Sequence, residues 1–426
     1  MIRFLLKGLL RDKSRSLLPL IVVAIGVMLA VFAHGYINGL MVDMIEQTAR
    51  LTTGHVKVMT KAYSENMGQV PNDLALIEVS ALKTDLEQTF PDIKWVTRIK
   101  FGGLIDVPDE NGETRNQGPS MGIGLDLLSE NSDEAERLNL NKAMVRGSLP
   151  ATAGEVLLSE DFSQRLEVNP GEEVTLIGST MNGGMAIYNF RVSGTVRFGN
   201  TAMDRGTVIA DLRDVQLALD MDDAAGEILG FFSNRYYDDD VAAPVLVKFH
   251  EKYPENTGEF DPVMLRLRDQ EGLGLFVDLT SSMGAIITIV FMVAMSLVLW
   301  NAGLLGGLRR YGEIGIRLAI GEEKGHIYRS MISESLMIGI AGTIVGTAIG
   351  LGLSWLMQTH GLDISEFTKN ATTAIMMPDI IRSRITPSDF YIGFIPGVLS
   401  TLAGTMLSGV GIYKRQTAQL FKELEA

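Results

Sequence analysis

The 426-residue chain contains no cysteine and no phosphate loop of the form G-x-x-x-x-G-K-S/T. Without cysteine it forms no disulfide and carries no thiol chemistry, although many cytosolic proteins also lack cysteine and the compartment stays open. Without the phosphate loop, and without a Leu-Ser-Gly-Gly-Gln signature, it lacks the usual means of binding the phosphates of ATP. The sequence therefore predicts a chain that is not an enzyme and has no cofactor of its own.

Side chains that could build a catalytic or metal site are sparse. The chain has five histidines, and His55 and His250 stand isolated from other metal-ligand residues. The run YYDDD at 236–240 offers either a cation site or a solvated surface, because adjacent acids lack the alternating oxygen spacing of a calcium loop. Neither a catalytic constellation nor a metal site is predicted.

Apolar residues are abundant: they make up 46% of the chain, and the mean hydropathy is +0.19. Runs of roughly twenty apolar residues are long enough for a helix to cross about 30 Å of hydrocarbon. Such runs lie at 17–40, 283–305, 336–357 and 390–412. Four transmembrane α-helices are therefore predicted, with buried helices of a large soluble core as the alternative. The first run is too long for a cleaved signal peptide, so we expect it to remain as a helix.

Basic residues cluster in three segments beside the predicted spans, at 1–16, 306–335 and 413–426. The positive-inside rule places these segments in the cytoplasm and the short loop at 358–389 on the other side. Both termini are then cytoplasmic, and 41–282 forms a large extracytoplasmic domain. The first segment is either an amphipathic helix in the membrane interface or a simple basic flank.

The domain at 41–282 is acidic, with 40 Asp and Glu against 21 Lys and Arg. This balance argues against nucleic acid as a partner. Short strands alternate with occasional helices, which is typical of an α+β fold. Among these elements we expect strands at 104–107 and 244–249, and helices at 80–89 and 212–219.

Two lobes are predicted within this domain. One consists of residues 41–130 and 236–272, and the other is inserted between them at 131–235. Both ends of the domain must return to the membrane. We therefore expect the strand at 262–267 to complete the first lobe beside the segment that leaves the first span.

Two polar or small-residue patterns occur inside the predicted spans. His34 and Asn38 lie near the outer end of the first span, where an ionisable side chain is a functional candidate unless it is simply solvated. Gly342, Gly346 and Gly350 recur every four residues in the third span. Such small faces let helices approach closely, which predicts helix packing within the chain or a dimer contact.

A polar segment, RRYGEIGIRLAIG at 309–321, separates the second and third apolar runs. It is similar to the motif R-R-E-I-G-I-R-R-A-L-G-A that follows the second helix in the MacB-type (FtsX-like) superfamily of ABC transporter permeases. Ile320 replaces the common Leu, and Tyr311 and Gly312 stand where the charged run usually continues. The matching residues are Glu313, Ile314, Gly315, Ile316, Arg317, Ala319 and Gly321.

Further stretches extend the resemblance over most of the chain. Residues 154–176, 188–196 and 204–219 resemble the family's extracytoplasmic domain, which pairs a porter lobe with an inserted sabre lobe. The stretch at 37–63 looks most like the lipoprotein-releasing LolC and LolE branch. The resemblance implies a bacterial inner (cytoplasmic) membrane, with the large domain in the periplasm.

In that family a short cytoplasmic helix between the second and third spans docks on a separate ATPase subunit, which binds ATP and Mg. Glu313 and Arg317, at i and i+4, share one helical face and could pair with each other or with the ATPase. Ile314, Gly315 and Leu318 would supply a small and apolar docking surface. The alternative is that the segment only anchors the chain by its positive charge. The residues that the resemblance assigns to coupling are Arg310, Glu313, Ile314, Gly315, Arg317, Leu318 and Gly321.

The resemblance implies a permease that pairs with a second copy, identical or related, and with two ATPase subunits, among membrane lipids. The leading hypothesis is extraction and release of lipoproteins or other amphiphiles from the outer leaflet, with a periplasmic carrier. The alternatives are MacB-like efflux of antibiotics or peptides through an adaptor, FtsX-like activation of a cell-wall hydrolase, and a membrane-anchored enzyme.

Overall fold

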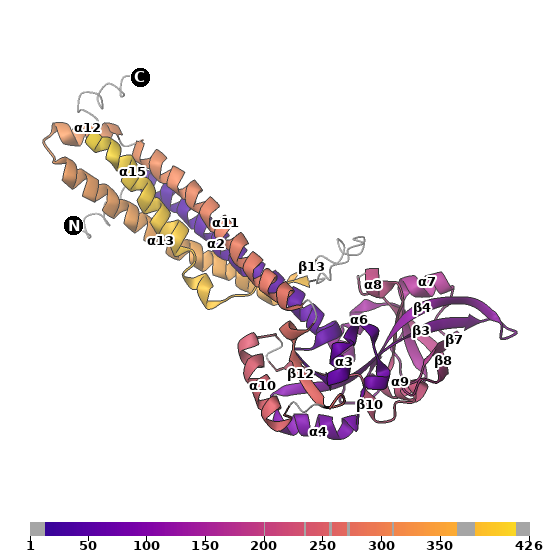
Figure 1. Ribbon diagram of the computed structural model, residues 1–426. Coiled ribbons are helices and arrows are strands. Elements are labelled where there is room, and N and C mark those ends of the chain that lie inside the picture. The colour runs from indigo at the N-terminus through magenta and orange to yellow at the C-terminus, as the bar shows by residue number, and fades with distance from the viewer. Residues whose placement is uncertain are drawn as a thin grey trace. The chain divides into compact units, whose positions relative to one another are not determined.

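The computed structural model describes residues 13–199, 201–233, 236–254, 258–270, 273–308, 311–363 and 380–414. These residues form two compact units, one helical and one built around a β-sheet (Figure 1). The helical unit takes its described residues from the stretches up to Asp43, from Leu279–Asp363 and from Ile380 onward, and the other unit covers Met44–Asp278.

The helical unit is built from long apolar helices that run side by side (Figure 1). Four helical segments in the described residues are long and apolar enough to cross a membrane, at the positions of the four predicted runs. Three helices of this unit have 36 or 37 residues, or roughly 54 Å of helix, which exceeds the roughly 30 Å of a hydrocarbon core. The helices are α2 (Lys13–Thr48), α11 (Leu273–Leu308), α12 (Tyr311–Ala319), α13 (Lys324–His360) and α15 (Thr401–Lys414).

The last span does not begin as a regular α-helix. It opens with a 3-10 turn, η5 (Pro387–Phe390), and a π-helical turn, η6 (Ile395–Ser400), before α15 starts. Pro396 lies in the π turn and lacks the N–H that a regular helix would use there.

The second unit contains one sheet of ten strands within the described residues. The strand order is β12-β1-β11-β3-β4-β9-β6-β8-β5, and β7 pairs with β3 and β8. The strands are β1 (Val56–Thr60), β3 (Ile93–Pro108), β4 (Thr114–Leu125), β5 (Met144–Gly147), β6 (Glu155–Ser159), β7 (Glu173–Ser179), β8 (Met185–Val196), β9 (Thr207–Asp211), β11 (Glu227–Phe232) and β12 (Pro262–Arg266). The helices of this unit include α3 (Lys61–Glu65), α4 (Val79–Thr89), α5 (Glu134–Arg137), α7 (Glu160–Leu166), α9 (Leu212–Leu219) and α10 (Asp239–Lys252).

The strand β3 belongs to both lobes of the sheet. Its first part, Ile93 to Arg98, pairs with β11, and its second part, from Ile99, pairs with β4 and β7. The strand pairing therefore places 99–125 with the inserted lobe and 224–232 with the first lobe, unlike the predicted boundaries at 131 and 235. The difference arises because β3 is one continuous 16-residue strand, of which the sequence predicted only 104–107.

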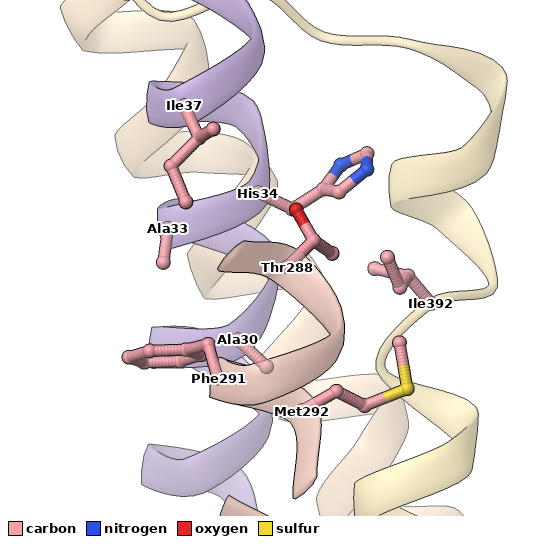
Figure 2. A pocket seen from close by; sticks show the side chains of 8 residues that line it. All are labelled: Ala30, Ala33, His34, Ile37, Thr288, Phe291, Met292 and Ile392. Atoms are coloured by element: carbon pink, nitrogen blue, oxygen red, sulfur yellow. The ribbon is translucent and has the colours of Figure 1, made fainter. Parts of the chain in front are cut away.

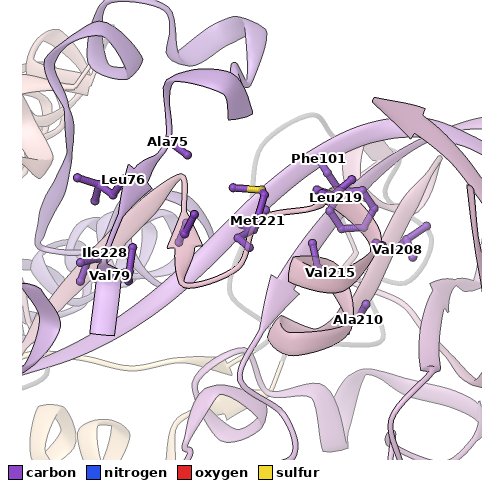
Figure 3. Close-up of a cluster of buried hydrophobic side chains, with 14 of the residues drawn as sticks. Ala75, Leu76, Val79, Phe101, Val208, Ala210, Val215, Leu219, Met221 and Ile228 are labelled. Atoms are coloured by element: carbon purple, nitrogen blue, oxygen red, sulfur yellow. The ribbon is translucent and has the colours of Figure 1, made fainter. Parts of the chain in front are cut away.

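One continuous apolar core lies beneath both lobes. Figure 3 shows Leu76, Val79 and Ile228 from the first lobe in the same buried cluster as side chains of the second. The second lobe contributes Phe101 and Val215 to it. Because the two lobes share this buried cluster, they are packed against each other. A close-packed interior of this kind can transmit displacement from one lobe to the other.

The element predictions for this unit hold in three places and fail in one. Helices α4 and α9 confirm the helices expected at 80–89 and 212–219, and β12 pairs antiparallel with β1 as the returning strand. The strand predicted at 244–249 is wrong, because these residues lie in the helix α10. The residues of α10 that pack on the core recur at helical spacing, which the β-branched run obscured. They are Ala242, Val245, Leu246 and Phe249.

Candidate functional site

The predicted coupling segment is a short helix, α12, joined to α13 by a tight turn. Gly321 lies in the left-handed region with φ of +99°. Its N–H donates to the Leu318 carbonyl at 3.1 Å, and the Glu322 N–H donates to the Arg317 carbonyl at 3.1 Å. These two bonds form a Schellman motif, which favours glycine at this position. Gly321 therefore ends α12 and sets the turn into α13.

Arg317 forms an ion pair across this turn. Its Nε and Nη2 donate to the two carboxylate oxygens of Glu322, both at 2.7 Å. The hydrogen-bonded guanidinium holds the pKa of Glu322 below its usual range. The predicted alternatives for Arg317 were Glu313 or the ATPase, and the structure adds Glu322 as a partner within the chain. Arg310 and the side chain of Glu313 lie outside the described residues.

The apolar side chains of α12 divide between two faces. Ile314 is only 2% exposed and packs against Ile327 and Met331 of α13, with Leu318 beside them. Ile314 and the buried Gly315 therefore attach α12 to α13, with the partly buried Leu318 beside them, and the docking role expected for Ile314 and Leu318 stays a prediction. Among the described side chains of α12 and its turn, the large apolar ones that stay exposed are Ile316, 53% exposed, and Ile320, 81% exposed.

The three predicted glycines of the third span face α2 within the same chain. A Cβ on Gly346 would lie 2.5 Å from the Ala24 carbonyl oxygen, and one on Gly342 would lie 2.6 Å from the Val23 Cγ1. Gly350 would meet the Met28 carbonyl oxygen at 3.0 Å. Of the two uses predicted for this stripe, the structure shows helix packing within the chain.

His34 makes a contact that its sequence neighbourhood does not show. Its Nδ1 lies 2.6 Å from the Asp389 Oδ1, and the Asp389 side chain is 1% exposed. The Asn38 amide lies 3.4 Å from the His34 ring. Asp389 also closes a capping box with Thr386 at the start of η5. The pair joins the first span to the start of the last.

The space beside His34 is too small for a substrate. Figure 2 shows it between α2 and α11, with Thr288 near His34, Phe291 near Ala30 and Met292 near Ile392. The cavity has about 10 Å³, which is room for about one water molecule. His34 and Asp389 therefore form a polar contact between spans and do not line a ligand pocket.

The acidic run at 236–240 forms the start of α10. The Asp238 side chain accepts from the Asp240 N–H as the helix cap. Asp239 pairs with Arg268 at 2.9 Å and with Arg266 at 3.3 Å. Within the described part of the chain no group of three or more His, Asp or Glu side chains could hold a metal ion.

Two family models match the chain. The MacB-like periplasmic core domain matches residues 16–243, and the FtsX-like permease C-terminal domain matches residues 285–417. Together they cover the first span, the sheet unit up to residue 243, and the chain from residue 285 in the second span to residue 417.

Individual proteins and one solved structure also match the chain. The lipoprotein-releasing system transmembrane protein LolC of Xylella fastidiosa is 24% identical over 283 residues, which is 64% of this chain and 64% of that protein. The matched stretch thus spans just under two thirds of the length of this relative. The macrolide export ATP-binding/permease protein MacB of Wolinella succinogenes is 33% identical over 86 residues, or 20% of this chain and 13% of that protein. The periplasmic region of MacB from Actinobacillus actinomycetemcomitans covers 53% of this chain and 94% of that structure, with a TM-score of 0.35 and 14% identity.

Proposed function

Because the chain belongs to the family of ABC transporter permeases with a MacB-like periplasmic core and an FtsX-like permease domain, we propose that it works with a separate ATPase subunit. The chain lacks a phosphate loop, which supports an ATPase in another protein that binds ATP and Mg. The short helix α12, with Ile316 and Ile320 open, is the surface that we assign to that partner. This role requires α12 and both termini to be cytoplasmic, and Met44–Asp278 to lie in the periplasm of a bacterial inner membrane.

The work proposed for this permease is the extraction and release of lipoproteins or other amphiphiles from the outer leaflet. One observation carries the proposal: α2 runs without a break from the first span to Thr48, and its following turn, η1 (Ala49–Thr53), ends inside the sheet unit. A rigid helix of this kind can carry displacement from one side of a membrane to the other. The long match to the lipoprotein-releasing LolC supports the choice of substrate.

A polar channel through one chain has little support in the described spans. Outside their ends, the described spans expose mainly apolar side chains, and the partly buried His34 pairs with the buried Asp389. We therefore propose a complex of two permease copies, identical or related, and two ATPase copies. ATP-driven closure would move the periplasmic units, and no solute would pass through a pore.

The proposal is tested by purifying the chain with a co-expressed ATPase in lipid nanodiscs and measuring ATP turnover. A triacylated lipoprotein is expected to raise turnover severalfold, and the same protein without its acyl chains serves as the control. An ATP turnover that is the same with and without the triacylated lipoprotein contradicts the proposal.

Efflux of antibiotics or peptides is the second candidate, and the local matches to macrolide export proteins favour it. A macrolide or peptide that raises ATP turnover in the same nanodiscs, where the lipoprotein does not, would establish this candidate.

A further inference from the structure

The helix that leaves the first span ends in an unusual way. After α2 the backbone makes the π-helical turn η1, which Gly54 closes with φ of +62° and an N–H bond of 2.8 Å to the Ala49 carbonyl. The last four carbonyls of a helix have no partner within the helix. Here they belong to residues 50–53, and η1 lies inside the sheet unit. Their partners must therefore come from elsewhere in this unit.

Three side chains bind all four of these carbonyls. The Arg98 Nη1 donates to the carbonyls of residue 50 at 2.8 Å and residue 51 at 3.1 Å. The Lys100 Nζ lies 3.4 Å from the Thr52 carbonyl oxygen, and the Gln270 Nε2 donates to the Thr53 carbonyl at 3.1 Å. Two of the three are cations, which match the negative end of the helix dipole.

The two cations are themselves held in place by buried carboxylates. Arg98 is 1% exposed, and its Nε donates to Glu134 at 2.7 Å. Lys100 and Lys57 each place Nζ at 3.0 Å from the same oxygen of Glu227. Burial lowers the pKa of Lys57 to about 8, whereas the two ammonium groups hold the pKa of Glu227 below its usual range against its burial. The two cationic capping side chains, Arg98 and Lys100, are thus fixed by ion pairs.

The end of α2 also contacts the sheet unit before η1, through Glu46. Glu46 of α2 accepts from the His55 Nε2 at 3.2 Å and from the backbone N–H of Tyr237. The Phe232 N–H donates to the His55 Nδ1 at 3.0 Å, so a neutral His55 ring carries its hydrogen on Nε2. Both sides of the helix end therefore contact the sheet unit.

The capping residues Arg98 and Lys100 lie where β3 passes from one lobe to the other. Arg98 is the last residue of β3 paired with β11, and Lys100 already pairs with Ile123 of β4. Residues two apart on a strand point to the same face, so both reach the same helix end. Gln270 comes from the segment that returns toward the second span, which brings both connections of the unit to one point.

We propose that Arg98, Lys100 and Gln270 are positioning residues of a rigid joint that passes the movement of α2 into β3, and through β3 into the second lobe. The proposal rests on the proposed function for the source of that movement. The rigidity of the joint can be measured without transport.

The test measures the distance between two spin labels in the full chain in lipid nanodiscs. Because the native chain has no cysteine, Met44→Cys in α2 and Met121→Cys in β4 are its only labelling sites. The labelled chain is expected to give one narrow distance distribution. Adding Lys100→Met and Gln270→Leu should broaden it about twofold, because the carbonyls of Thr52 and Thr53 lose their partners and the helix end frays beyond the two carbonyls that Arg98 still binds. Lys100→Arg should restore most of the narrow distribution when Gln270 is retained.

The matched control is Lys248→Met. Lys248 also donates to a helix-end carbonyl, that of Thr89 at 2.9 Å, but at the end of α4. The Lys248→Met variant should leave the distance distribution unchanged. A distribution that stays narrow without the caps, or that broadens equally with Lys248→Met, overturns the joint. Broadening that comes with a uniform loss of thermal stability of the whole unit also overturns it, because the residues would then only stabilise the fold.

A parallel measurement separates the joint from the proposed function. In nanodiscs with the ATPase, the Lys100→Met and Gln270→Leu variant should release severalfold less triacylated lipoprotein per ATP hydrolysed, with ATP turnover retained. If the amount of lipoprotein released per ATP hydrolysed is unchanged in this variant, movement does not pass through the joint and the proposal is wrong. If the native complex releases no lipoprotein, the proposed function fails, and the spin-label distances still decide whether the joint is rigid.

Discussion

The division of α12 into a packed face and an open face predicts that two similar isoleucines respond in opposite ways to substitution. Ile320, which is 81% exposed, should be replaceable by Ser with less than about 0.5 kcal/mol change in stability. Ile314, which is 2% exposed, should cost about 2–5 kcal/mol on replacement by Ala, because a cavity forms against Ile327 and Met331.

Binding of the ATPase should show the reverse order. Burying an isoleucine side chain at an interface is worth roughly 1.5–3 kcal/mol. Loss of the Ile320 side chain should therefore weaken ATPase binding about 10- to 100-fold, since about 1.4 kcal/mol changes the dissociation constant tenfold. Ile316→Ser should have a smaller effect, because Ile316 is only 53% exposed before docking.

The assay is titration of a labelled ATPase onto the chain in nanodiscs, together with thermal unfolding of the chain alone. The control is Leu353→Ser, because Leu353 is an exposed residue of α13 outside the coupling segment. It shows whether replacing any exposed apolar side chain by serine weakens ATPase binding. Unchanged ATPase affinity in a folded Ile316→Ser and Ile320→Ser double variant would refute the assignment of this face.

Three further predictions concern packing and charge. Gly346→Ala should destabilise the helical unit by about 1–3 kcal/mol, whereas Gly352→Ala on the same helix, where a Cβ meets nothing within 4 Å, should be neutral or stabilising; thermal unfolding in detergent compares them. His34→Leu should cost about 1–3 kcal/mol because buried Asp389 loses its partner on the first span, and adding Asp389→Asn, which removes the charge and can still accept from Thr386, should recover part of the loss; additive losses in a double-mutant cycle would show that the pair does not interact. Glu227→Gln should cost roughly 3–5 kcal/mol at pH 7, because it leaves buried Lys57 and partly buried Lys100 without their carboxylate. Because the folded-state pKa of Glu227 is lowered from 4.5, its contribution is present above that pH and is lost as the pH falls through the folded value, so the gap between native chain and variant should narrow in acid unfolding curves.

The four apolar runs were the easiest features to predict, because length and hydropathy alone identify a candidate span. Local patterns also identified α4, α9 and the return of β12. The helix α10 was missed because Pro244 and the β-branched residues after it suggested a strand, although the cap at Asp238 and the 3–4 spacing of buried residues favoured a helix. The full length of β3 was missed because the strand pairs in both lobes, and its buried residues do not alternate regularly with exposed ones as in a half-buried strand.

The site was harder to predict because its contacts join distant residues. Asp389 lies 355 positions from His34, and only its capping box with Thr386 marks it in the sequence. Ile314 and Ile316 are both apolar, so a helical pattern alone cannot decide which one faces α13. Glu322 lies just beyond the motif, and the turn at Gly321 brings it to Arg317.

The most direct test of the central proposal is ATP-dependent release of a fluorescent triacylated lipoprotein from nanodiscs that contain the chain and its ATPase. The account predicts release into the soluble fraction only with hydrolysable ATP, and none when the ATPase partner is catalytically inactive. Steady ATP hydrolysis with the lipoprotein still in the membrane, in a preparation that responds to a macrolide or a peptide, would contradict it.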